Sequence, residues 1–309
     1  GISFDCIETA VIPSGLITAL ATPFGADGSL DLPAWQNLLA GQLKAAVDAV
    51  VVAGSPGEAA TLDDDEYVLL IRTAVAALGH AMPVIAGTGL SCTAQTIART
   101  QLATAAGASH ALVVTPPYVR PTQQGLLAHY RAVAAQGGLP VILYNVPGRT
   151  GCDLLPETVM ELAQVHGIVG FKEAVSDPVR LRALQPLGQM PGFALLSGDD
   201  GTACLALQAG FNGLVSVGSN VLPASYALMC GLALKGEVDA AHSWDARLAP
   251  YHAFCGVEPN PIPVKALLRR RGIGHGLRLP LCELSADHHA QADVLAAAVP
   301  ALEELSGRI

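Results

Sequence analysis

The sequence has few charged side chains, and basic residues are scarcer than acidic ones. Only 14% of the 309 residues are charged, and 17 lysines and arginines stand against 26 aspartates and glutamates, for a net charge of −9. A nucleic-acid partner requires a basic surface, so the composition argues against one. The 51% hydrophobic content argues against disorder and is enough for a large core.

Signals for membrane insertion, export and disulfide formation are also missing. No apolar run reaches the roughly 18 residues that span a bilayer, and residues 1–13 lack the basic and apolar regions of a secretory signal. The seven cysteines are scattered, odd in number and without a C-x-x-C pair. We therefore expect reduced thiols, a cytoplasmic location and no membrane partner.

Motifs for nucleotides and metals are absent as well. Gly87-Thr88-Gly89 follows a predicted strand but lacks the third glycine of a dinucleotide fingerprint, and no Walker, G-x-S-x-G or H-E-x-x-H motif is present. The nine histidines do not gather at metal-ligand spacing, and the pair Asp199-Asp200 is more typical of a helix cap than of a cation site. We expect no metal and no cofactor.

Short apolar runs alternate regularly with helical patterns. Eight strand-plus-helix units in a row favour a closed (β/α)8 TIM barrel, an α/β fold, over a doubly wound sheet. The strands are expected at 15–22, 49–52, 83–87, 111–114, 140–145, 168–172, 193–197 and 213–217. The helices are expected at 32–46, 63–78 with Asp63 as its cap, 93–106, 123–136, 156–165, 178–187, 201–209 and 222–235.

After residue 236 the strand signals stop. Helical patterns at 238–248, 263–271 and 286–305 predict a small C-terminal helical domain. We therefore divide the chain into an N-terminal extension (1–13), a barrel that carries the active site (14–236) and the C-terminal helical domain (237–309).

The end of the sixth predicted strand carries the most informative residue. The chain has only four lysines, and Lys44, Lys235 and Lys265 occupy positions typical of helical surface cations. Lys172 instead closes the buried apolar run at 168–171. Burial of an amine there favours its neutral, nucleophilic form. The alternative is a lysine whose amine reaches solvent from the strand end.

Other polar side chains fall on the same rim, because TIM barrels place their chemistry at the carboxyl ends of the strands. Tyr144, Ser55 and Tyr118 can form a chain of hydroxyls that moves protons. Arg149 can hold a carboxylate through two parallel hydrogen bonds. Together with Lys172 they indicate Schiff-base chemistry on a ketone. The structural alternatives are backbone bonding or interface packing for the tyrosines, a turn position for Ser55 and a surface salt bridge for Arg149.

Four segments carry a family resemblance: 144–151 (YNVPGRTG), 170–174 (GFKEA), 196–200 (LSGDD) and 257–265 (VEPNPIPVK). With them, residues of about 15–280 resemble the pyruvate-dependent class I aldolases, the family of dihydrodipicolinate synthase and N-acetylneuraminate lyase. The resemblance implies that Lys172 forms an imine with pyruvate and that Tyr144 is the central proton donor and acceptor. Ser55 stands where the synthases usually have threonine.

The resemblance also assigns the second substrate and the pocket walls. Arg149 matches the arginine that receives aspartate semialdehyde and that separates the synthases from the sialic-acid lyases. Tyr118 matches a tyrosine supplied by a neighbouring subunit of a homotetramer, a dimer of dimers. Val215 and Gly198 match positions whose backbone lines the pyruvate pocket.

One residue departs from the family pattern. The loop 54–58 reads Gly-Ser-Pro-Gly-Glu, whereas relatives usually carry Thr-Thr or Ser-Thr before the second glycine. Amides of this loop hold the pyruvate carboxylate in the family, and Pro56 has no N–H to offer. A lost donor to a charged group costs about 1–3 kcal/mol, and proline also restricts the backbone of Ser55.

The resemblance implies condensation of pyruvate with L-aspartate 4-semialdehyde to 4-hydroxy-tetrahydrodipicolinate, a step of lysine biosynthesis through diaminopimelate. Three alternatives stay open: another pyruvate-type aldolase, a sugar-acid dehydratase of the same family, and a weakly active metabolite-binding protein, which Pro56 favours. Gln95 and Pro117 replace a glutamate and a tyrosine that bind inhibitory lysine in some relatives. We therefore expect no inhibition by lysine.

Overall fold

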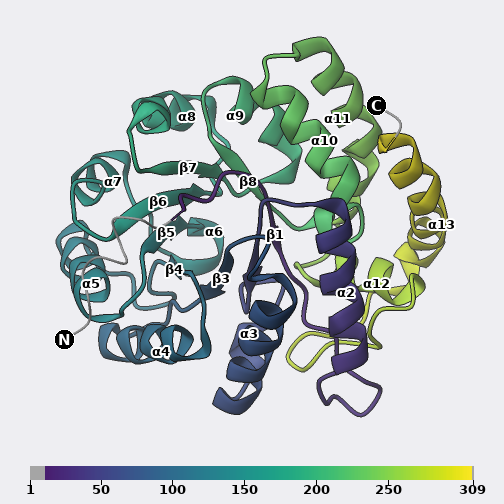
Figure 1. The fold of residues 1–309 in the computed structure, drawn as a ribbon, viewed down its shortest axis with the longest axis horizontal. Helices are drawn as coiled ribbons and strands as arrows, with labels where there is room; N and C mark the ends of the chain where they lie inside the picture. Colours follow the sequence, from purple (N-terminus) through teal and green to yellow (C-terminus); the bar gives the residue numbers. More distant parts are fainter. Residues whose placement is uncertain (1–10, 308–309) are drawn as a thin grey trace.

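A computed structural model describes residues 11–307 as a closed barrel of eight parallel strands (Figure 1). Each strand pairs with the next in sequence, and β8 pairs with β1, which confirms the predicted TIM barrel. The strands are β1 (Gly15–Ala19), β2 (Ala49–Val52), β3 (Val84–Gly87), β4 (His110–Val114), β5 (Val141–Asn145), β6 (Ile168–Glu173), β7 (Ala194–Ser197) and β8 (Gly213–Ser216). Most of the expected N-terminal extension, 1–10, lies outside the described residues.

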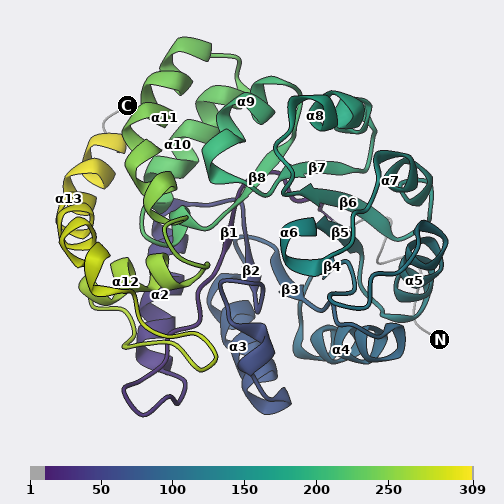
Figure 2. The ribbon, with the colours of Figure 1, turned by 180° about the vertical axis from the view of Figure 1, so that it is seen from behind.

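A ring of helices surrounds the strands. It consists of α2 (Leu32–Ala45), α3 (Asp64–Leu78), α4 (Thr93–Ala106), α5 (Gln123–Gln136), α7 (Pro156–Leu162), α8 (Pro178–Leu184), α9 (Ala203–Gln208) and α10 (Pro223–Leu234). The C-terminal helices α11 (Val238–Phe254), α12 (Ile262–Arg270) and α13 (His289–Ser306) lie outside α10 and α2 on one side of the barrel (Figures 1 and 2). Among the described helices, none combines the length and apolar character needed to cross a membrane.

Side chains that point into the barrel fill it. They are Ile17, Ala19, Ala49, Val51, Ile85, Leu112, Ile142, Val169, Ala194, Leu196 and Val215, all buried. The barrel interior is therefore a packed core, and only the rim at the strand ends remains for polar chemistry.

Local signals in the sequence explain several boundaries. Asp63 caps α3 as predicted: its side chain accepts from Glu66 N (2.8 Å), and the Glu66 carboxylate accepts from Asp63 N (3.2 Å). Helix α7 ends three residues before the predicted position, because Gln164 N and Val165 N turn back to carbonyls three residues earlier. Helix α11 runs six residues past its predicted end, with Pro250 inside it.

The C-terminal helices pack against the barrel helices. The carboxylate of Glu303 on α13 accepts from the amides of Ala224 and Ser225, in the first turn of α10, at 3.0 and 2.8 Å. These amides are among the unsatisfied donors at a helix N-terminus, so the contact joins the last helix to the eighth barrel helix. The boundary at residue 236 stays a prediction.

Candidate active site

A pocket of about 630 Å3 opens at the carboxyl ends of the strands. Five of the predicted site residues line it: Ser55, Pro56, Tyr144, Arg149 and Lys172. The C-terminal part of the chain also reaches its mouth, through Pro259, Asn260, Pro280 and Leu281. Residues more than 200 positions apart in sequence therefore share one site.

Lys172 and Tyr144 are neighbours on adjacent strands. They are paired in the register of β5 and β6, and Lys172 Nζ lies 3.9 Å from the centroid of the Tyr144 ring. Lys172 is 6% exposed. A Cβ on Gly198 would lie 2.9 Å from Lys172 Cε, so a larger residue there would displace the lysine side chain. Val215 lies in the buried layer of the barrel interior, against which Tyr144 packs.

The loop after β2 folds back on itself. Gly57 N donates to Gly54 O and Glu58 N donates to Ser55 O, both at 3.1 Å. The amides of Gly57 and Glu58 are thus used within the loop, and Pro56 has none. Ser55 lines the pocket beside the buried Pro56.

Arg149 lies on α6 (Pro147–Thr150), a one-turn helix that the sequence patterns did not predict. Pro147 supplies a first helical residue, and Gly151 ends the helix at φ +81°, a conformation that favours glycine. The guanidinium is exposed, and its Nη2 donates to Asn260 O at 3.2 Å. Arg149 is therefore available to an anion at the pocket mouth.

Tyr118 does not line the pocket of its own chain. Its side chain is 91% exposed, and its backbone adopts φ +76°, which is uncommon outside glycine. Its amide donates to Thr150 O at 2.9 Å, so the segment that carries Arg149 also positions Tyr118.

The expectation that Lys265 is a surface cation is wrong. Its side chain is 6% exposed, and Nζ lies 2.5 Å from Oε2 of Glu58, the last residue of the Ser55 loop. Burial lowers the pKa of Lys265, while Glu58 acts in the opposite direction. Lys265 stands three residues from both Ile262 and Leu268 on the buried face of α12, a spacing that could have signalled its burial.

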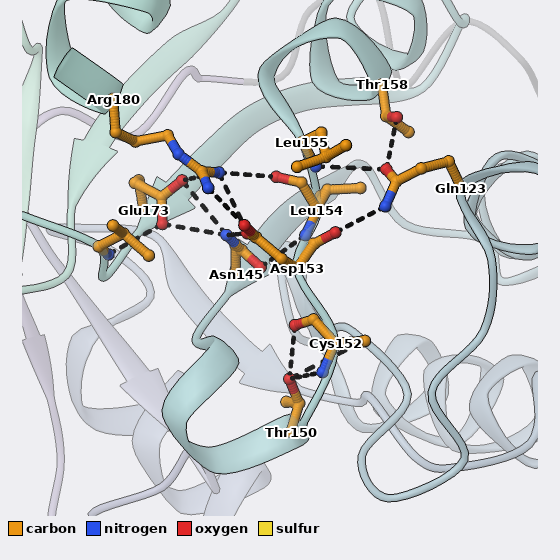
Figure 3. Close-up of polar contacts among 11 residues, drawn as sticks. Gln123, Asn145, Thr150, Cys152, Asp153, Leu154, Leu155, Thr158, Glu173 and Arg180 are labelled. Carbon is orange, nitrogen blue, oxygen red and sulfur yellow. Dashed lines mark hydrogen bonds and ion pairs between the residues drawn. The ribbon is translucent and has the colours of Figure 1, made fainter. Parts of the chain in front are cut away.

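A second cluster of polar side chains lies on the side of β5 and β6 that faces the helices. Asn145 and Glu173, the residues that follow Tyr144 and Lys172, are buried and hydrogen-bonded to each other (Figure 3). Burial raises the pKa of Glu173 to about 7. Both residues lie in the family segments 144–151 and 170–174, but neither periodicity nor motif assigned them a role.

The acidic pair after β7 was expected to cap a helix, and Asp199 stands at the N-cap position of the short helix Asp200–Thr202 but makes no side-chain cap hydrogen bond. Asp200 Oδ2 accepts from the amides of Val217 and Gly218 after β8, at 3.2 and 2.8 Å. Burial raises the pKa of Asp200. Within residues 11–307, no group of three or more His, Cys, Asp or Glu side chains is placed to hold a metal ion.

The sequence matches the dihydrodipicolinate synthetase family over residues 12–299. The chain belongs to this family. It is 68% identical over 293 residues to the 4-hydroxy-tetrahydrodipicolinate synthase of Stenotrophomonas maltophilia strain K279a, covering 95% of this chain and 98% of that protein. Identity to the synthase of the same name in Xanthomonas axonopodis pv. citri is 64%, covering 96% and 97%.

Solved structures of the dihydrodipicolinate synthetase family share the fold. The dihydrodipicolinate synthase of Acinetobacter baumannii, determined in complex with pyruvate, superimposes with a TM-score of 0.89 at 36% identity, covering 93% of this chain and 99% of that one. The predicted family membership is confirmed.

Proposed function

We propose that this protein is a 4-hydroxy-tetrahydrodipicolinate synthase, which condenses pyruvate with L-aspartate 4-semialdehyde in lysine biosynthesis. The observation that carries the proposal is the contact between buried Lys172 and Tyr144, in one pocket with Arg149. Relatives that match nearly the whole chain at 64–68% identity carry the name of this activity, which supports it.

Lys172 provides the nucleophile. Its neutral amine attacks C2 of pyruvate, water leaves, and an iminium forms that acts as an electron sink. A proton then moves from the C3 methyl group to a base, and Tyr144, beside the amine, is the residue placed to carry it. The resulting enamine attacks the aldehyde carbon. The amino group of the acceptor displaces Lys172 from C2, which closes the ring and frees the lysine.

Ser55 and Tyr118 extend the path of the proton. The Ser55 hydroxyl lines the same pocket as Tyr144. Tyr118 is exposed, so it can serve a neighbouring subunit and not its own pocket. We propose a homotetramer formed from two dimers, in which Tyr118 completes the site of its partner. Sedimentation of the Tyr118→Phe variant separates the two roles: the assembly should remain while turnover falls.

Arg149 determines the acceptor. Its exposed guanidinium lies at the pocket mouth, at the end remote from the barrel interior, and can bind the acceptor's carboxylate through two hydrogen bonds. Gly198 lies against the Lys172 side chain and Val215 lies in the barrel interior; neither is among the residues that line the pocket, and their proposed role is to bound the pyruvate end of the site through their backbone. The six cysteines among the described residues are free, in keeping with the predicted cytoplasmic location.

Pro56 is the observation that favours an alternative activity, that of another pyruvate-type aldolase or of a sugar-acid dehydratase. It lines the pocket without an amide to donate. A panel of acceptors decides between them: aspartate semialdehyde, succinate semialdehyde and sugar-derived aldehydes with pyruvate, and sugar acids alone. The proposal predicts the highest kcat/KM with aspartate semialdehyde. Faster turnover of any other substrate would contradict it.

A further inference from the structure

The residues that follow Tyr144 and Lys172 face the opposite side of the barrel wall. Asn145 pairs in register with Glu173, as Tyr144 does with Lys172. Successive side chains of a strand point to opposite faces, so Asn145 and Glu173 point away from the pocket, toward the helices. Asn145 is completely buried and Glu173 is 2% exposed.

These two side chains join a compact network (Figure 3). Asn145 Nδ2 donates to Glu173 Oε1 (3.2 Å) and to Asp153 Oδ1 (2.8 Å). Glu173 Oε1 also accepts from Val175 N (2.9 Å). Arg180 of α8 forms an ion pair with Asp153, and its Nη1 lies 3.6 Å from Glu173 Oε2. The Asn145 amide and the Arg180 guanidinium thus each contact both carboxylates, those of Asp153 and Glu173.

The two carboxylates differ in their titration. Burial raises the pKa of Glu173 to about 7, and Asp153 adds to this rise. Burial would raise the pKa of Asp153 as well, but the hydrogen bonds from Arg180 and Asn145 outweigh it and lower that pKa. Glu157 of α7 acts on Arg180, and Lys172 lies on the other face of β6. Near neutral pH, Glu173 is therefore the carboxylate of the pair that changes charge.

The network holds a segment that has no strand partner. In residues 151–155, Leu154 N donates to Asn145 Oδ1 (2.9 Å), and Leu154 O accepts from Arg180 Nη1 (3.3 Å). Gln123 Nε2 donates to Asp153 O at 2.7 Å. Side chains thus replace a sheet ladder along this backbone, as Figure 3 shows.

This segment leads directly back to the predicted acceptor site. It follows α6, which carries Arg149 and Thr150, and Thr150 O holds the amide of Tyr118. The backbone of Lys172, unlike the segment at 151–155, is held within the sheet, because β6 pairs with both β5 and β7 at that position. A change in Glu173 should therefore disturb the segment at 149–155 more than Lys172.

We propose that Glu173 is a positioning residue for the acceptor site: its ionised carboxylate fixes Asn145 and Arg180, and through them the segment that presents Arg149. The inference rests on the proposed function, since the acceptor is the aldehyde substrate of that reaction. Glu173 is ionised above about pH 7. As the pH falls, the carboxyl takes up a proton, Arg180 keeps its ion pair with Asp153 but loses the one with Glu173, and the acceptor binds more weakly.

The test compares Glu173→Gln with the wild type between pH 6 and 8.5. Glutamine keeps the shape and an acceptor oxygen but cannot ionise. In the wild type, KM for aspartate semialdehyde should fall about tenfold as the pH rises through 7, the size of one charge-assisted hydrogen bond. In Glu173→Gln the KM for aspartate semialdehyde should stay high at every pH, without the step, that is, the fall as the pH rises through 7. Titration of the substrate itself affects both proteins equally.

Two further variants keep the test decisive if Glu173→Gln folds poorly. Burial is the main cause of the raised pKa of Glu173, and Asp153→Asn removes the negative charge that adds to this rise, so the step should move to lower pH. Glu161→Gln on α7 removes an exposed ion pair with Arg131 and should leave the profile unchanged. An unshifted step in Asp153→Asn would contradict the inference.

Borohydride trapping with pyruvate distinguishes failure of the inference from failure of the proposed function. Glu173→Gln should be trapped as efficiently as the wild type. If trapping and acceptor use fall equally, Glu173 serves Lys172 or the fold, and the inference is wrong while the function stands. The inference is also wrong, and the function still stands, if Glu173→Gln is trapped normally and its KM for the acceptor falls with rising pH as in the wild type. If the wild type is not trapped at all, the proposed function fails and the inference falls with it.

Discussion

Removal of the Lys265 ammonium group would leave a buried carboxylate without its partner. Glu58 is 5% exposed, and its Oε2 lies 2.5 Å from Lys265 Nζ. The other oxygen of Glu58 accepts from Arg278 N at 3.0 Å, a contact that remains in a Lys265→Met variant. Loss of one partner of a buried ion pair costs about 3–5 kcal/mol, because the remaining charge stays desolvated.

This cost should be visible in thermal unfolding. Each kcal/mol lowers the melting temperature of a large domain by about 2–4 °C, so we expect Lys265→Met to melt about 6–20 °C below the wild type. Lys235→Met is the matched control, because Lys235 is exposed, and its melting temperature should not change. The double variant Glu58→Gln/Lys265→Met should recover part of the loss, because it removes the stranded charge.

The same variant should affect pyruvate binding, because Glu58 ends the loop that carries Ser55 and Pro56. We expect a higher pyruvate concentration for half-maximal borohydride trapping in Lys265→Met. A melting temperature within about 2 °C of the wild type, less than 1 kcal/mol by the same scale, would show that the pair does not stabilise the fold and would refute the reasoning.

Three further predictions concern the ligands. Arg149→Ala should lower kcat/KM for aspartate semialdehyde about 10- to 150-fold, the value of charged hydrogen bonds, with trapping by pyruvate retained; equal losses in both assays would remove Arg149 from the acceptor site. Pro56→Thr should tighten pyruvate binding by restoring an amide donor, and unchanged or weaker binding would mean that other groups hold the carboxylate. Millimolar lysine should not inhibit, because Gln95 and Pro117 stand where some relatives have the glutamate and the tyrosine that bind lysine; tight binding by calorimetry would contradict this.

The barrel could be predicted from the sequence because its signals are local. Each buried strand is a short apolar run, and the helices show local periodicity and in some cases a capping residue, as at Asp63. The rim residues Lys172, Tyr144 and Arg149 follow from the strand ends alone, since closure of the barrel brings those ends together.

The remaining features depend on contacts between distant parts of the chain. The pairing of Lys265 with Glu58 spans 207 positions, and a pattern within α12 does not name the partner. Asn145 and Glu173 meet because of the register of β5 and β6, and Arg180 reaches them from α8. Helix α6 is a single turn, too short for a period to show.

Reductive trapping shows directly which lysine forms the imine with pyruvate. The protein is treated with pyruvate and borohydride, digested and mapped by mass spectrometry. We expect one adduct, the reduced imine of pyruvate on Lys172, which is absent in Lys172→Met and present in Lys265→Met. An adduct on Lys265 or another lysine, or none on the wild-type protein, would contradict the account.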